Sequence, residues 1–470
     1  MQELWRQSAG DLAKAIASKQ VSSSEVVEAH LARIEAVNPV LNAIVRVLAA
    51  EARAGAAEAD RQVAAGAPLG ALHGVPFTIK TNIDLAGFPT TSGVVPLENA
   101  VAQVDAPVVE RMKAAGAIPI ARTNMPDLGL RVHTDSSLHG LTRNPWNLGR
   151  TAAGSSGGEA AAIATGMSPI GLGNDIGGSL RNPASACGIA SIKPSAGRVP
   201  DAETIPGADR LLASQLMAVQ GPMARRVADV RLGLQALIGA HPRDPWSIDA
   251  PLVGRPLKGP IRIAVVAEPP GGQTDPLVAA AVRRAADALS DAGYDVVEAC
   301  PPRYEEAVEV WASLLMGDFA SVLGDIGPLM GADGQGFLEA FNRSIPALGG
   351  TAAMSALHPR REGIARAWSM FMADHPLVLS PTWSQLPFEH GFDVAGQGAA
   401  EATKALMRPV TPANLLGLPS ACVPASHDAA TNLPIGVLLT GQRFREDVCL
   451  DAAEAVEARL PLRTPIDPAG

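Results

Sequence analysis

Two short turns rich in glycine and serine constrain this chain more than any other feature. The first turn is Gly154–Gly158 and the second is Gly173–Ser179. Between them, the small-residue segment 159–165 predicts a helix and the apolar segment 170–172 predicts a strand. Because the turns lie at the two ends of one helix–strand unit, we expect them to meet in space.

Three interpretations of these turns do not need a reactive serine at Ser179. Segments such as Gly-Ser-Ser-Gly-Gly are common in flexible linkers, but here a helix and a strand follow at once. A phosphate cradle would use the same backbone amides, yet no Gly-Lys-Ser/Thr follows and the dinucleotide glycine spacing is absent. A nucleophile elbow would centre on Ser156 within G-x-S-x-G, with His427 as the late histidine. The strand that should precede this elbow is missing, because residues 145–150 are typical of a turn.

The fourth interpretation makes Ser179 the nucleophile of an enzyme. The neighbouring amides, from Ile176 through Gly177 and Gly178 to Ser179 itself, can hold a developing oxyanion. Glycine lets the chain curl so that several amides converge on one point. The pattern therefore predicts an oxyanion hole formed by the same turn that carries the nucleophile.

A serine nucleophile needs a base, and no histidine accompanies this segment. Lys80 ends an apolar run that predicts a strand over residues 73–80. Loss of water at such a position keeps a lysine neutral, so that it can accept a proton. Ser155 can relay this proton from Ser179.

The chain resembles the amidase signature family along nearly its whole length. The motifs that carry the likeness are Gly74–Lys80, Gly154–Gly158 and Asp175–Arg181, and 24 residues separate Ser155 from Ser179 as in the family. Further landmarks lie at residues 123–127, 144–147, 187–188, 193–194, 221–225, 412–414 and 433–436. The departures are small: Thr81, Asn174 and Ala153 replace residues that are common in the family.

The resemblance implies an amidase with a Lys80–Ser155–Ser179 triad and a cis peptide bond between Gly154 and Ser155. A neutral Lys80 would act as the base, Ser155 as the proton relay and Ser179 as the acylated nucleophile. We expect three further residues to support the turns: Ser156, Asp175 and Arg181. The substrate pocket is expected to include Met125, Leu128, Gly129, Leu130 and Trp383.

The resemblance also implies an α/β fold, a single α/β/α domain over residues 1–470 with a mixed, mostly parallel central sheet. Residues 1–65 are expected to be N-terminal helices, 66–240 the catalytic core, and about 300–375 a helical segment that shapes the pocket. A Ser22–Glu25 capping box begins a helix that Asn38-Pro39 should end. Asp105 should cap a helix over 106–115, and residues 261–299 predict a strand–helix–strand unit with parallel strands.

Composition limits the kinds of partner and the cellular compartment that we expect for this protein. The net charge of −9 argues against nucleic-acid binding. The four cysteines are scattered, without CxxC, which favours a reducing compartment and no metal site. We find neither a signal-peptide pattern nor a long uncharged apolar stretch, so we expect a cytoplasmic protein that does not enter a membrane. We expect no cofactor; a homodimer is one expectation that the family suggests.

The substrate stays open at this stage. A small aryl or alkyl amide, an arylamide or a hydrazide would each suit a serine amidohydrolase. An alternative is the glutamine-hydrolysing subunit of a tRNA-dependent amidotransferase, although the apolar 300–375 segment favours a free-standing hydrolase. A different class, an inactive ligand-binding protein of the same fold, conflicts with the intact triad.

Overall fold

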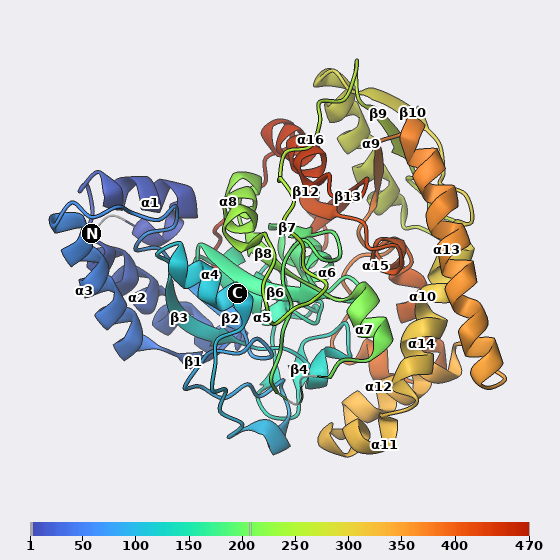
Figure 1. Cartoon of the computed structure of the whole chain (residues 1–470), viewed down its shortest axis with the longest axis horizontal. Coiled ribbons are helices and arrows are strands. Elements are labelled where there is room, and N and C mark those ends of the chain that lie inside the picture. The colour runs from blue at the N-terminus through green and yellow to red at the C-terminus, as the bar shows by residue number, and fades with distance from the viewer. Residues whose placement is uncertain (1–2, 206, 208, 470) are drawn as a thin grey trace.

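A single large mixed sheet runs through the molecule and is flanked by helices (Figure 1). The computed structural model describes residues 3–205, 207 and 209–469. In spatial order the eleven strands are β1 (Ile44–Val47), β3 (Ile118–Thr123), β2 (Pro76–Lys80), β6 (Ile170–Asp175), β8 (Val219–Ala224), β7 (Ala190–Lys193), β12 (Ser420–Asp428), β13 (Leu433–Gly441), β11 (Leu377–Pro381), β9 (Arg262–Val265) and β10 (Asp295–Glu298). Two short strands, β4 (Asp135–Ser136) and β5 (Gly140–Leu141), pair separately.

The expected α/β class and mixed sheet are confirmed, but the expectation of a mostly parallel sheet is wrong. Among the described residues, four ladders of this sheet are parallel and six are antiparallel. Two of the central strands, β7 and β8, were not recognised in the sequence, and they pair with each other antiparallel. β12 and β13 are joined by the short turn 429–432, which only an antiparallel pair can accommodate.

The helices have the following bounds: α1 (Ala9–Ala17), α2 (Ser23–Leu41), α3 (Ala49–Ala64), α4 (Pro107–Ala114), α5 (Gly157–Ala164), α6 (Arg181–Cys187), α7 (Leu212–Met217), α8 (Val227–Leu237), α9 (Pro276–Asp291), α10 (Tyr304–Phe319), α11 (Leu323–Ile326), α12 (Ala332–Arg343), α13 (Thr351–Asp374), α14 (Gln397–Leu406), α15 (Thr411–Leu415) and α16 (Glu446–Arg459). Residues 304–374 are thus mainly helical. The unit β9–α9–β10 has the parallel pairing expected for it.

Two helix boundaries differ from expectation. The Ser22–Glu25 capping box is present at the start of α2, but the helix continues through Pro39 to Leu41. A proline so near the end removes only one bond of the last turns, so the helix tolerates it. Asp105 does not cap α4: the cap residue is Ala106, and the Asp105 carboxylate accepts from the Ala86 amide instead.

The sheet separates two apolar cores. Along β11, Leu377 and Leu379 face one core whereas Val378 faces the other, as the alternation of side chains along a strand requires. The core containing Val378 also contains buried residues of α5, α6, α10, α12 and α13, and the opposite core contains those of α1, α4, α8, α9 and α16. The two serine-bearing turns lie beside α5 and α6, on the side of the core that contains Val378.

Neither a long membrane helix nor a metal cluster is found among the described residues. No single helix is both long and apolar enough to cross a membrane, although Tyr304–Phe319 and Leu323–Leu329, bent by 69°, meet both criteria as a pair. No group of three or more His, Cys, Asp or Glu side chains is placed to hold a metal ion in the part of the chain that the structure describes.

α5 approaches neighbouring backbone so closely that only glycine fits at Gly158. A Cβ at this position would lie 2.5 Å from the Asn124 backbone nitrogen and 2.6 Å from the Ala43 carbonyl oxygen. Gly398 in α14 has open space instead, with nothing within 4 Å. The two helical glycines therefore form a matched pair: a side chain would clash with backbone at Gly158 but not at Gly398.

We therefore expect Gly158→Ala to lower the free energy of unfolding by about 3 kcal/mol, because backbone must move to admit the methyl group. Gly398→Ala should raise it by up to about 1 kcal/mol through helix propensity. Chemical denaturation of both variants measures the difference. Equal stability of the two variants would contradict the close approach.

Candidate active site

Lys80 lies at the end of β2 and is completely buried. Its Nζ is 2.6 Å from Ser155 Oγ and 2.7 Å from Asn174 Oδ1. Burial lowers the pKa of Lys80 to about 7, against the opposing effect of nearby carboxylates, Asp175 first among them. The lysine therefore changes charge near neutral pH, as a general base requires.

Ser155 stands just before α5, and the Gly154–Ser155 peptide bond is cis, as expected. A Cβ at Gly154 would lie 2.8 Å from the Val132 carbonyl carbon, so the chain passes close to its neighbour here. The adjacent Ser156 is buried, and its Oγ has no hydrogen-bond partner among the described residues. Ser156 thus has no base within hydrogen-bond reach, unlike Ser155.

The turn that carries Ser179 is held by Asp175, the last residue of β6. The Asp175 carboxylate accepts hydrogen bonds from the amides of Gly178 (2.8 Å) and Leu180 (3.1 Å). Arg181 donates to both of its oxygens, at 2.9 and 3.0 Å, and Asn414 Nδ2 donates at 2.8 Å. Burial by itself disfavours the charged carboxylate, yet Arg181 holds the pKa of Asp175 well below its usual range.

This arrangement changes the set of amides that can face a substrate oxygen. The Gly178 amide was expected to contribute, but it is bonded to Asp175. Among the described residues, the amides of Ile176, Gly177 and Ser179 have no acceptor. From the other side, the Trp311 indole donates to the Ile176 carbonyl at 2.9 Å and so fixes the start of the turn.

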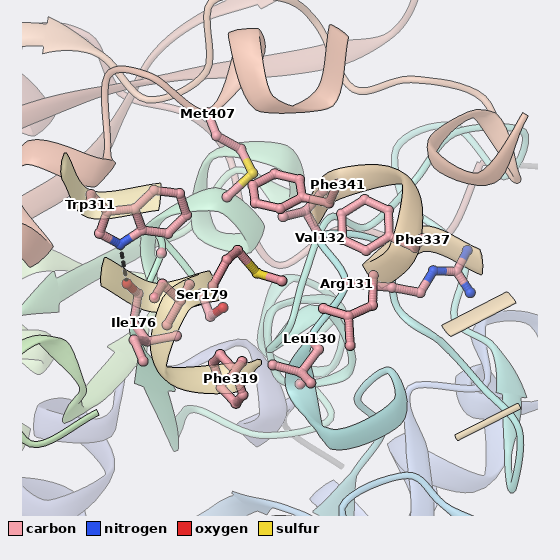
Figure 2. A pocket seen from close by; sticks show the side chains of 15 residues that line it. Leu130, Arg131, Val132, Ile176, Ser179, Trp311, Phe319, Phe337, Phe341 and Met407 are labelled. Carbon is pink, nitrogen blue, oxygen red and sulfur yellow. Dashed lines mark hydrogen bonds between the residues drawn. The ribbon is translucent and has the colours of Figure 1, made fainter. Parts of the chain in front are cut away.

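Ser179 lies between two cavities. The apolar cavity is formed by Ser179 and residues that include Leu130, Trp311, Phe319, Phe337, Phe341 and Met407 (Figure 2). The polar cavity is formed by Ser179, Ser155 and residues that include Asn82, Asp201, Glu203, Arg210 and Gln220. Because Ser179 is 8% exposed, its hydroxyl is reached through these cavities rather than from an open surface.

Four of the five residues expected in the pocket lie at or just behind the cavity walls. Gly129 and Leu130 line the apolar cavity, and Leu128 and Gly129 line the polar one. Met125 is fully buried behind them, with its methyl carbon 3.2 Å from where a Gly129 Cβ would be. Each of these residues therefore lies at or just behind the cavity walls.

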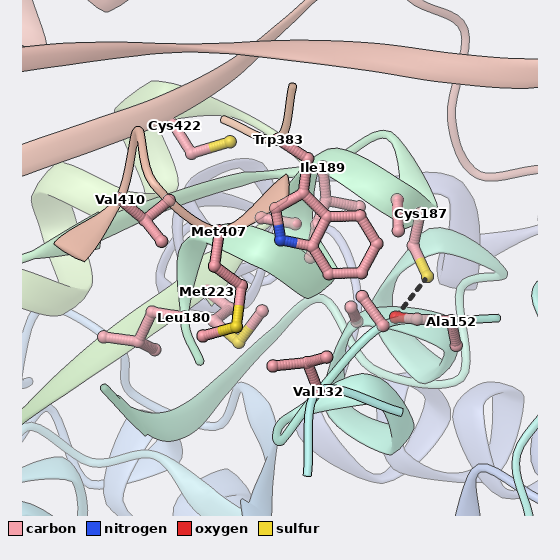
Figure 3. Close-up of a cluster of buried hydrophobic side chains, with 14 of the residues drawn as sticks. Val132, Ala152, Leu180, Cys187, Ile189, Met223, Trp383, Met407, Val410 and Cys422 are labelled. Atoms are coloured by element: carbon pink, nitrogen blue, oxygen red, sulfur yellow. Dashed lines mark hydrogen bonds between the residues drawn. The ribbon is translucent and has the colours of Figure 1, made fainter. Parts of the chain in front are cut away.

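Trp383 is placed differently from expectation. Its ring stacks on Phe388 with centroids 5.7 Å apart, inside a core cluster with Val132 and Met407 (Figure 3). It does not line either cavity at Ser179, and lines a separate small cavity with Leu386. The sequence placed Trp383 near the site but gave no information on the direction of its ring.

The aromatic wall of the apolar cavity comes mainly from α10 and α12. Trp311 and Phe319 lie on α10, and Phe337 and Phe341 lie on α12 with rings 5.7 Å apart. The sequence pointed to residues 300–375 as the segment that shapes the pocket but did not single out Phe337 and Phe341. Their spacing of four residues, one helix turn, was the available signal.

A family model described as amidase matches residues 25–450, and the chain therefore belongs to the amidase family. An indoleacetamide hydrolase from Bradyrhizobium diazoefficiens is 44% identical over 461 residues, covering 97% of this chain and 87% of that protein. An acylamidase from Rhodococcus erythropolis is 34% identical, covering 97% of this chain and 95% of that protein. The structure of 6-aminohexanoate cyclic dimer hydrolase complexed with substrate superposes with a TM-score of 0.84 at 30% identity, covering 98% of this chain and 99% of that one. The chain is an amide hydrolase that acts on C–N bonds.

Proposed function

We propose that this enzyme cleaves amides through an acyl-enzyme on Ser179, with Lys80 as base and Ser155 as proton relay. Neutral Lys80 takes the Ser155 proton while Ser155 takes the Ser179 proton, and Ser179 Oγ attacks the carbonyl carbon. The amides of Ile176, Gly177 and Ser179 stabilise the oxyanion. The C–N bond then breaks as the proton returns through Ser155 to the leaving nitrogen, and water hydrolyses the ester.

The observation that carries this proposal is the buried contact between Lys80 Nζ and Ser155 Oγ at 2.6 Å, with Ser155 and Ser179 lining one cavity. A lysine without water around it loses its proton easily, which is the property a base needs. The alternative nucleophile, Ser156, has a hydroxyl without any partner.

We propose further that the acyl group of the substrate is apolar and aromatic and occupies the apolar cavity. The aromatic wall formed by Trp311, Phe337 and Phe341 supports this, as does the likeness to a protein named indoleacetamide hydrolase. Glutamine fits this cavity less well, because its α-carboxylate needs a free cation. The one arginine in the lining, Arg131, is already paired with Asp393 at 2.9 Å.

The nucleophile is tested with a fluorophosphonate, which phosphonylates activated serines. We expect the wild type and Ser156→Ala to be labelled, and peptide mass spectrometry to place the label on Ser179. Ser179→Ala should be unlabelled and should lose turnover by at least about 10⁴-fold, as for other nucleophile deletions. An active Ser179→Ala, or an unlabelled wild type, would refute the proposal.

The base is tested by the pH dependence of kcat/KM with an uncharged amide. Because only neutral Lys80 accepts a proton and its pKa is about 7, kcat/KM should rise with pH below about 7 and level off above it. Asn174→Asp places a carboxylate where Asn174 Oδ1 now meets Nζ at 2.7 Å. The inflection should then move up by at least about one pH unit. A flat profile from pH 5 to 9, or an unmoved inflection in the variant, would argue against Lys80.

The acyl site is tested with Phe341→Ala and two primary amides, phenylacetamide and acetamide. Loss of an aromatic contact worth about 1.5 kcal/mol lowers kcat/KM for phenylacetamide about tenfold, whereas acetamide is too small to reach the ring. Phe371→Ala removes a ring that stacks on His375, outside both cavities, and serves as the control. Equal losses for the two amides would contradict the assignment.

A further inference from the structure

The polar cavity contains side chains that the proposed mechanism leaves unused. Its volume is about 170 Å³, whereas a single water needs only about 10–15 Å³. It therefore has room for a group of several atoms. Because Ser155 and Ser179 both line it, a group bound there lies next to the bond that breaks, in a cavity adjacent to the apolar one.

Gln220 presents an unused acceptor in this cavity. The side chain is 3% exposed, and its Nε2 donates to Asp201 Oδ1 at 2.9 Å. Because a carboxylate only accepts, this bond fixes which end of the amide is nitrogen. Oε1 then has no donor among the described residues, although it is buried. An unpaired buried acceptor costs about 1–3 kcal/mol, so the site favours a ligand with an N–H group.

Glu203 adds a carboxyl group to the wall that also contains Gln220, and this group is negatively charged above its pKa. Asp201 and Arg210 form an ion pair at 2.9 Å, whereas the Glu203 carboxyl group has no ion-pair partner among the described residues of the cavity wall. The next residue, Thr204, is anchored, because its amide and its hydroxyl both donate to Asp84 Oδ2, at 2.7 and 2.6 Å. No hydrogen bond to the Glu203 carboxylate is made by the residues that the structure describes.

The surroundings of Glu203 favour a cation next to it. Burial and the neighbouring Asp201 raise the pKa of Glu203 to about 8, with a smaller contribution from Asp84, while Arg210 and Lys80 act in the opposite direction. A cation beside Glu203 favours its charged form. Asp201 and Asp84, the two carboxylates that raise the Glu203 pKa, also attract a ligand that carries positive charge. A leaving group with a carboxylate would meet Glu203 as a like charge, with Arg210 already paired.

We propose that the polar cavity is a leaving-group subsite, in which the Glu203 carboxylate and Gln220 Oε1 receive an amine that carries a second, protonated nitrogen. The substrates it selects are N-(aminoalkyl) amides of small apolar acids. The proposal rests on the proposed function and extends it to the other half of the substrate. On C–N cleavage the amine takes its proton from Ser155 and leaves through the polar cavity while the acyl group stays on Ser179.

The test compares three amides of phenylacetic acid with the parent primary amide at about pH 8.5, above the pKa of Glu203, where an aliphatic amine is still protonated. The substituents on the amide nitrogen are 2-aminoethyl, propyl and carboxymethyl. They are of similar size and differ in charge. We expect kcat/KM for the aminoethyl amide to exceed that for the propyl amide at least tenfold, and the carboxymethyl amide to be the poorest.

Glu203→Gln removes the charge with little change in shape, and we expect it to bring the aminoethyl-to-propyl ratio to within threefold of one. Glu309→Gln is the matched control, because Glu309 is exposed on α10 and lines neither cavity; the ratio should stay as in the wild type. Thermal unfolding of both variants checks that they fold. The readout is a ratio, so a general loss of activity in Glu203→Gln does not affect it.

The outcomes separate the two proposals. Hydrolysis of the primary amide with a ratio near one in the wild type, or a ratio that survives Glu203→Gln, overturns the subsite and leaves the Ser179 mechanism standing. Preference for the carboxymethyl amide also overturns it, because the cavity would then select the opposite charge. Absence of hydrolysis of every amide together with an unlabelled Ser179 overturns the proposed function itself.

Discussion

The site depends on one buried ion pair, between Asp175 and Arg181. Asp175 ends β6 and Arg181 begins α6, so the pair closes the turn that carries Ser179. The Asp175 carboxylate also accepts from two amides within that turn and from Asn414, whereas Arg181 reaches the Val410 carbonyl. Removing one partner of a buried pair typically costs about 3–5 kcal/mol, because the other charge is left uncompensated. The shape of the turn is therefore tied to the stability of this pair.

β6, the strand that ends at Asp175, also helps to position Lys80, the proposed base. β2 and β6 are parallel neighbours, with Ile79 opposite Leu172, so their carboxyl ends share one edge of the sheet. Lys80 ends β2 at that edge, and Asn174 of β6 accepts from its Nζ. The sheet thus does two things for the lysine: it removes water from the side chain, and it directs the amine at Ser155. Sequence segments almost a hundred residues apart meet through this register.

The contact between Lys80 and Ser155 could be predicted from the sequence, whereas the shape of the pocket could not. Lys80, Ser155 and Ser179 stand in local motifs whose chemistry depends on short-range order, and the structure brings the first two into contact. Phe337 and Phe341 reach the site because α12 packs against α14 and meets Trp311 of α10, and such packing leaves no local motif. The Gly178 amide shows a subtler limit, because the sequence does not show that Asp175 competes for it. The strands β7 and β8 were missed as well, so the proportion of parallel pairing was overestimated.

The place of Ser179 between two cavities sets an order of events. Ser179, Gly129, Ile176 and Phe319 line both cavities, and the remaining walls belong to one or the other. In the proposed reaction the acyl group and the amine occupy different cavities, so the amine can depart while the ester still fills the apolar one. Under this proposal water then enters the space that the amine has left, and we expect ping-pong kinetics. An added nucleophile such as hydroxylamine would enter by the same side and compete with water for the acyl group.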